Sequence, residues 1–97
     1  MQSPLQISFR NMDSSDAVEA NVREKVEKLD QQFDEILTFR IIIQALHKHH
    51  HKGNLYHLRI YITVPDGELV VSRRPDLHHA HEDIYVAVRD AFNAARR

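Results

Sequence analysis

The segment Tyr56-His57-Leu58-Arg59-Ile60-Tyr61-Ile62-Thr63-Val64 alternates apolar and polar side chains along its whole length. A period of two residues indicates a β-strand with one buried face. The β-branched run from Phe39 to Leu46 precedes it and predicts a second strand. After it, Pro65-Asp66-Gly67 predicts a turn, because proline fixes φ and glycine accepts positive φ. Glu68 to Ser72 then predicts a further strand. Short connections favour an antiparallel meander of these three strands.

The flanking segments complete the architecture. Leu5 to Arg10 alternates like a half-buried strand. Apolar residues at three- and four-residue spacing predict an amphipathic helix over residues 15–33, with Asp13-Ser14-Ser15-Asp16 at its start. A last helix is expected from Asp83 to the end. The order β-α-β-β-β-α indicates an α+β fold, a two-layer sandwich with two helices on one face of a four-stranded mixed sheet. The helical connection favours a right-handed parallel crossover between the first two strands.

Composition narrows the class of protein. The 97 residues are enough for one domain, 1–97, with one modest core, and 42% hydrophobic content is ordinary for a globular chain. The absence of cysteine excludes disulfides and cysteine-based zinc sites or nucleophiles. No apolar run approaches the roughly 18 residues that span a bilayer, and no signal peptide is predicted. We therefore expect a cytoplasmic protein without a membrane partner.

Seven of the eight histidines fall in two segments, His47–Gly53 and Leu77–Asp83. The expected strand order places both segments, treated as loops, at one end of the molecule, beside the starts of both helices. One interpretation is a metal site, since imidazole suits Zn²⁺, Ni²⁺ and Cu²⁺. Its candidate ligands are His49, His51, His78, His79 and His81, although no H-E-x-x-H spacing occurs.

Two other interpretations of this end remain open. One is a surface for phosphate or the RNA backbone, to which protonated histidines would add pH-dependent charge. Its fixed cations would be Lys48, Lys52, Arg59, Arg73 and Arg74. The other is a solvated polar loop without a ligand.

The chain carries no signature of catalysis. It has no cysteine, no G-x-S-x-G sequence and no glycine-rich phosphate loop, with two glycines in total. His81-Glu82-Asp83 brings histidine and carboxylates together, but neighbours at a helix start do not by themselves form an acid–base pair. We expect neither an enzyme nor a cofactor or small-molecule substrate.

Two segments, together with the element order, resemble a known family. Lys28-Leu29-Asp30-Gln31-Gln32-Phe33-Asp34-Glu35-Ile36 closes the first helix, and Asp83-Ile84-Tyr85-Val86-Ala87-Val88 opens the second. They are similar to the bacterial ribosome hibernation-promoting factors, also called ribosome-associated inhibitors or sigma-54 modulation proteins. The resemblance covers nearly the whole chain and suggests a short, histidine-rich form.

The resemblance implies a function and a set of contacts. Members of that family bind the small ribosomal subunit in the channel for messenger and transfer RNA, and block translation under stress or in stationary phase. Their basic helical face contacts ribosomal RNA. Lys25, Lys28 and Arg97 match basic positions of the family, and Arg89 and Arg96 are further cations on the last helix.

This chain also departs from the family. Glu19, Glu24 and Glu27 dilute the basic face, Arg89 stands where relatives often have an acid, and relatives carry a basic tail beyond the position of Arg97. These departures, with the histidines, leave an alternative: a metal- or pH-responsive binding module on the same fold with a changed partner.

Overall fold

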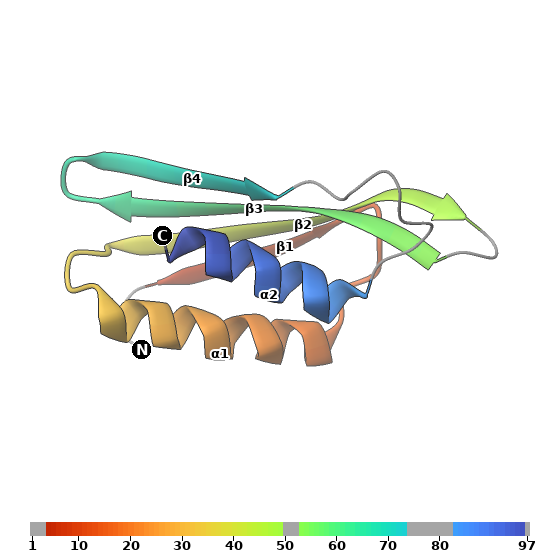
Figure 1. Ribbon diagram of the computed structural model, residues 1–97, viewed down its shortest axis with the longest axis horizontal. Helices are drawn as coiled ribbons and strands as arrows, with labels where there is room; N and C mark the ends of the chain where they lie inside the picture. Colours follow the sequence, from red (N-terminus) through yellow and green to blue (C-terminus); the bar gives the residue numbers. More distant parts are fainter. Residues whose placement is uncertain (1–3, 50–52, 74–82, 97) are drawn as a thin grey trace.

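Four strands and two helices follow one another in the predicted order, β-α-β-β-β-α (Figure 1). The structure, a computed structural model, describes residues 4–49, 53–73 and 83–96. The elements are β1 (Leu5–Arg10), α1 (Asp16–Gln32), β2 (Thr38–His49), β3 (Gly53–Val64), β4 (Gly67–Arg73) and α2 (Ile84–Ala95).

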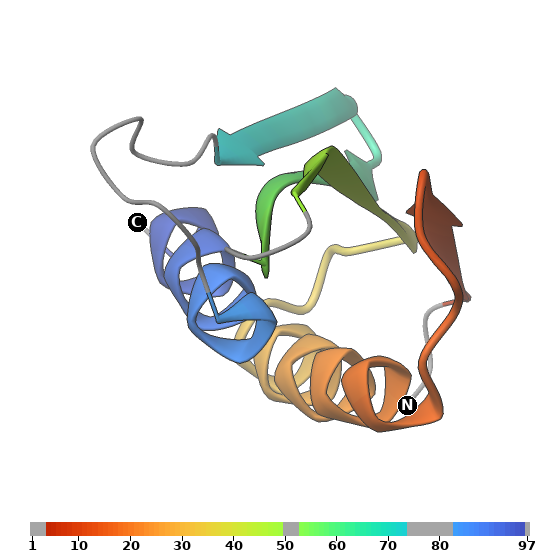
Figure 2. The same ribbon diagram turned by 90° about the vertical axis from the view of Figure 1, so that its right-hand side faces the viewer.

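The sheet has the strand order β1-β2-β3-β4. β1 runs parallel to β2, with Ile7 beside Ile41, and the remaining neighbours are antiparallel, with Ile43 beside Leu58. Both helices lie on the same side of this sheet (Figure 2). The predicted two-layer sandwich with a mixed sheet is therefore confirmed.

The core lies between the sheet and the helices. Alternate residues of the central strands point into it, and each helix contributes one apolar face. The buried apolar side chains with 0% exposure are Val22, Val26, Ile41, Ile43, Ala45, Leu58, Ile60, Ala87, Val88 and Ala91. Removing this apolar surface from water is the main source of stability. It also fixes which side chains remain outside, on the helices and on the far side of the sheet.

Side chains cap the start of each helix. Val18 N–H donates to Ser15 Oγ at 3.2 Å, and Tyr85 N–H donates to Asp83 Oδ1 at 2.8 Å. Each acceptor satisfies a backbone donor that has no partner within the helix. Ser15 and Asp83, expected as the first helical residues, are thus the N-caps. Phe33, expected as the last residue of the first helix, is its C-cap.

Replacing the cap Ser15 with alanine is expected to lower the free energy of unfolding by about 1 kcal/mol, because Val18 N–H loses its acceptor. Urea denaturation measures this change. Ser14→Ala is the matched control, since Ser14 is exposed and lies just outside the cap. Equal effects of the two substitutions would show that the cap contributes nothing.

One boundary prediction is wrong. The His47–Gly53 segment, expected to be a loop, belongs largely to a long hairpin: β2 continues to His49 and β3 begins at Gly53. The backbone pairs His47 with Leu55 and His49 with Gly53, after a register shift between Ala45 and His47. The strands can extend past the core because the backbone N–H and C=O groups of each strand form hydrogen bonds with the other strand. This pairing does not depend on the side chains.

The ends of β2 and β4 and the starts of both helices lie at the same end of the molecule (Figure 1). That placement agrees with the expected topology. The histidines that were expected to meet there, His50, His51, His78, His79 and His81, lie outside the described residues. Their meeting stays a prediction.

Candidate nucleic-acid interface

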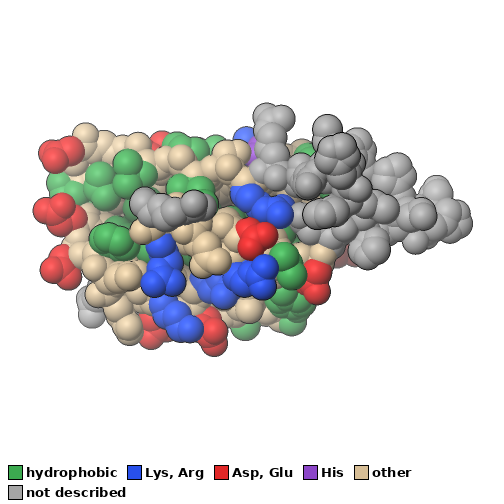
Figure 3. All heavy atoms as spheres, in the orientation of Figure 1, with side chains coloured by type: hydrophobic (Ala, Val, Ile, Leu, Met, Phe, Trp, Pro, Cys, Tyr) green, Lys and Arg blue, Asp and Glu red, His purple; other side chains and the backbone are tan. Residues whose placement is uncertain are grey.

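A groove of about 110 Å³ runs between α1 and α2. It is lined by Lys25, Lys28 and Leu29 from α1 and by Arg89, Phe92, Asn93 and Arg96 from α2. Spacings of three and four residues keep the polar residues of each helix on one face. Leu29 and Phe92 are buried, so they form an apolar floor beneath polar walls. Lys and Arg side chains gather on the face of the molecule that the two helices form (Figure 3).

The electrostatics of the groove favour an anion. Four of its lining residues are cations, and none of the described residues that line it is a carboxylate. The acids of α1, expected to dilute this face, do not line the groove, and Glu19 Oε2 instead pairs with Arg23 Nε at 3.4 Å. Lysine and arginine donors beside an Asn93 amide suit the oxygen atoms of a phosphate.

Arg89 is the most restrained of these cations. Its Nε and Nη2 both donate to Asp90 Oδ1 at 3.3 Å, and Asp90 Oδ2 accepts from Arg73 Nη2 at 3.4 Å. The carboxylate therefore lies between two guanidinium groups and offsets part of their charge. Lys25, Lys28 and Arg96 supply the rest of the positive charge that lines the groove.

Of the remaining predicted RNA contacts, the two with described side chains, Arg59 and Arg73, lie on opposite sides of the sheet. Arg73 ends β4 and is held against α2 by Asp90, with its side chain 20% exposed. Arg59 lies on the far side of the sheet, where its Nη2 donates to Gln44 Oε1 at 3.5 Å. Lys48 belongs to the extended part of β2. Lys52, Arg74 and Arg97 lie outside the described residues.

The predicted metal ligands gain no support from the described part of the chain. Within residues 4–49, 53–73 and 83–96, there is no group of three or more histidine and carboxylate side chains that could hold a metal ion. His49 is the last residue of β2. His57 Nε2 lies 2.7 Å from Ser72 Oγ, a local hydrogen bond across two strands. His51, His78, His79 and His81 lie outside the described residues, so the metal-binding alternative stays a prediction.

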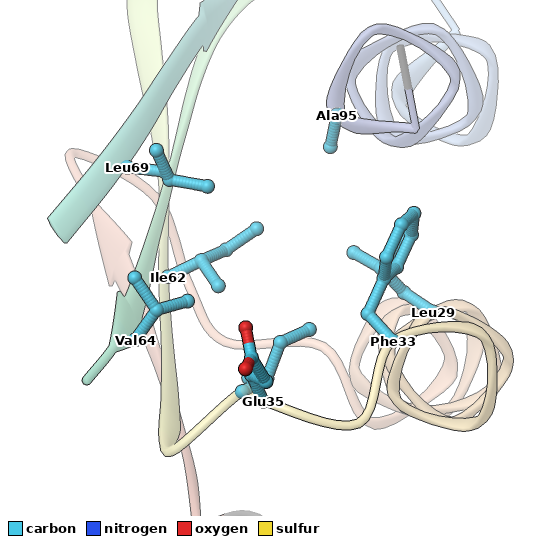
Figure 4. Close-up of a pocket in the computed structure, with 8 residues that line it drawn as sticks. Leu29, Phe33, Glu35, Ile62, Val64, Leu69 and Ala95 are labelled. Atoms are coloured by element: carbon cyan, nitrogen blue, oxygen red, sulfur yellow. The ribbon is translucent and has the colours of Figure 1, made fainter. Parts of the chain in front are cut away.

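A second pocket, of about 210 Å³, opens where the C-terminal ends of both helices approach the sheet (Figure 4). Its lining is apolar except for Glu35 and includes Phe33 and Leu69, which are 44% and 57% exposed. A single carboxylate in an apolar lining lacks the convergent polar groups that typify an active site. This pocket therefore does not compete with the groove as the site of recognition.

Sequence reasoning missed Asn93. It stands four residues after Arg89 and three before Arg96, so a helical projection of the last helix would have placed it on the same face. Neutral side chains are easily passed over when a site is sought by charge alone.

The chain is similar to known proteins over nearly its whole length. A sequence profile of the family described as "Sigma 54 modulation protein / S30EA ribosomal protein" matches residues 5–97. The N-terminal domain of Thermus thermophilus Protein Y has a similar structure, with a TM-score of 0.69 and 22% identity over 93% of this chain and 86% of that chain.

A ribosomal subunit interface protein from Coxiella burnetii gives a TM-score of 0.72 and 16% identity over 95% of this chain and 88% of that chain. At these identities the two structures establish a shared fold. A search of curated proteins gave no match. No helix in the described ranges is both long and apolar enough to span a bilayer.

Proposed function

The chain belongs to the family of sigma 54 modulation proteins and S30EA ribosomal proteins, and from this premise we propose that it binds the small ribosomal subunit through ribosomal RNA and inhibits translation. The family is one of ribosome-associated modulation factors and is not known as an enzyme family. The observation that carries the finer proposal is the groove between α1 and α2, where Lys25, Lys28, Arg89 and Arg96 line one surface.

The groove suits the backbone of RNA better than its bases. Its cations and the Asn93 amide donate to phosphate oxygens, which position a protein without reading sequence. Ribosomal RNA offers a fixed arrangement of phosphates, and the packing of α1 beside α2 sets where the cationic side chains of the groove start. Recognition would then depend on the match between the phosphates and these cations.

Inhibition of translation would follow if the bound protein occupied the place of another RNA on the ribosome. The resemblance to hibernation factors suggests the channel of messenger and transfer RNA as the binding place. A folded domain with principal-axis extents of 43 × 25 × 18 Å would exclude those RNAs from any part of the channel that it filled. Such a factor would act in the cytoplasm, on idle ribosomes under stress or in stationary phase.

Sedimentation with purified small subunits tests the proposal. We expect the chain to pellet with the subunits at low salt and to be released as salt rises, because phosphate contacts displace condensed counterions. With four cations in the groove, affinity should fall by about a hundredfold between about 50 and 200 mM salt. Failure to pellet at low salt, or pelleting indifferent to salt, would contradict the proposal.

A further inference from the structure

The face of the sheet that the helices leave uncovered is basic. Figure 2 shows both helices on the opposite side, so the outward side chains of the strands meet solvent. Alternation from the core residues directs Arg10 on β1, Arg40 on β2 and Arg59 on β3 to this outer side. Among the described outward positions, Glu68 is the one carboxylate. We call the surface of Arg10, Arg40, Arg59 and Tyr61 the arginine face.

Arg40 and Tyr61 form a stacked pair at the centre of this face. They are direct partners across β2 and β3, and the guanidinium carbon of Arg40 lies 4.4 Å from the centroid of the Tyr61 ring. Attraction between the cation and the ring holds the long arginine side chain in place. Arg40 is exposed while it lies over the ring, so the pair presents a planar cation to solvent.

Arg40 and Tyr61 line a shallow hollow of about 310 Å³, together with the polar side chains of Gln6, Thr38 and Thr63 and the carboxylate of Glu68. These side chains offer hydrogen-bond donors and acceptors around the exposed guanidinium. The hollow therefore combines a stacking surface, formed by the Arg40–Tyr61 pair, with neutral polar groups and the single carboxylate of Glu68. A flat ring that carries hydrogen-bond donors suits this lining.

Arg59 and Arg10 add charge along the strands. Arg59 stands two residues from Tyr61, about 7 Å along β3. It donates to Gln44, but its buried Nε has no hydrogen-bond partner among the described residues, so its donors are incompletely used. Arg10 lies beside Gln44 across β1 and β2 and is exposed. The charges thus extend from the stacked pair toward the end of β1.

We propose that the arginine face binds single-stranded RNA, with one base stacked on the Arg40 guanidinium and the neighbouring phosphates bound by Arg10 and Arg59. Unpaired bases expose their planes to aromatic rings and guanidinium groups, whereas a duplex hides them. This inference rests on the proposed function and deepens it, because the domain then contacts RNA on both of its layers.

Binding of a fluorescently labelled, single-stranded RNA of ten adenosines, measured by anisotropy at low salt, tests the arginine face. Arg40→Lys keeps the charge but loses the planar group, and we expect affinity to fall roughly tenfold. Arg23→Lys, the same substitution on α1, is the matched control and should bind like the wild type.

The helical groove also attracts RNA, so the comparison is repeated in a Lys28→Glu, Arg96→Glu background. The tenfold effect of Arg40→Lys should persist there. Equal binding by Arg40→Lys and wild type would overturn the inference, as would equal affinity for a ten-base-pair duplex. Competition by polyglutamate as strong as that by RNA would assign the face to acidic proteins and also overturn it.

The two proposals fail separately. If the chain pellets with small subunits but Arg40→Lys binds the oligonucleotide normally, the proposal of ribosome binding is supported. The proposal that the arginine face binds RNA is then contradicted. If the chain does not pellet, the proposed function falls, while the oligonucleotide measurement still decides whether the outer face of the sheet binds single strands.

Discussion

Reversing two charges of the helical groove, Lys28→Glu with Arg96→Glu, is expected to weaken binding to small ribosomal subunits by about a hundredfold at low salt. Each substitution removes an attraction to phosphate and adds a repulsion. At the dielectric of a protein surface, the pair should cost on the order of 3 kcal/mol in binding free energy. Sedimentation across a salt series measures both the affinity and its slope, which should also become shallower by about two units.

The control compares two single substitutions that change net charge equally: Lys28→Glu in the groove, and Arg23→Glu on the same helix but away from the groove. Arg23 lies beside Glu19 and does not line the groove. Circular dichroism would establish that each variant folds. If Arg23→Glu weakened binding as much as Lys28→Glu, net charge alone would be responsible and the groove would not be the binding site.

The sheet was predictable because strands with one buried face alternate apolar and polar residues along the sequence. Leu58, Ile60 and Ile62 alternate with polar residues, and all three proved to be buried on the helical side. The parallel pairing of β1 with β2 followed from the helix between them. These features depend on local pattern and on connection length, both of which a single sequence contains.

The extended hairpin was not predictable in the same way. Beyond Ala45, the strands carry histidine, lysine, glycine and asparagine between Leu46 and Leu55, so the apolar residues do not alternate. There the pairing is maintained by backbone hydrogen bonds, which the pattern of side chains does not reveal. Asn11 Nδ2 also donates to Ala45 O at 2.7 Å, at the register shift, and no local signal predicts a contact between residues so far apart.

The candidate site was predictable in its residues more than in its shape. Lys25 and Lys28 share a helical face by spacing, and so do Arg89 and Arg96. The two faces form one groove only because α1 packs beside α2. The sequence pattern does not reveal how these helices pack. The separation of Arg59 from Arg73 was available in principle, because alternation places Arg59 opposite the inward Leu58, whereas Arg73 shares the inward side of β4.

The second large effect expected is on stability. Leu58→Ala should lower the free energy of unfolding by about 2–5 kcal/mol, because it removes a side chain with 0% exposure and leaves a cavity. The total free energy of unfolding of a domain of this size is about 5–15 kcal/mol. A loss near 3 kcal/mol should lower the melting temperature by about 15 °C, which calorimetry measures directly.

Leu69→Ala is the matched control, the same substitution on the neighbouring strand at a side chain that is 57% exposed. It should cost less than about 1 kcal/mol, because most of the removed surface already meets water. Comparable losses for the two variants would contradict the placement of the core between sheet and helices. Leu58 contacts no RNA in the proposed complex, so the folded fraction of Leu58→Ala at 25 °C should still pellet with small subunits. Lost binding by a folded Leu58→Ala would show that the groove depends on how the core positions α2 over β3.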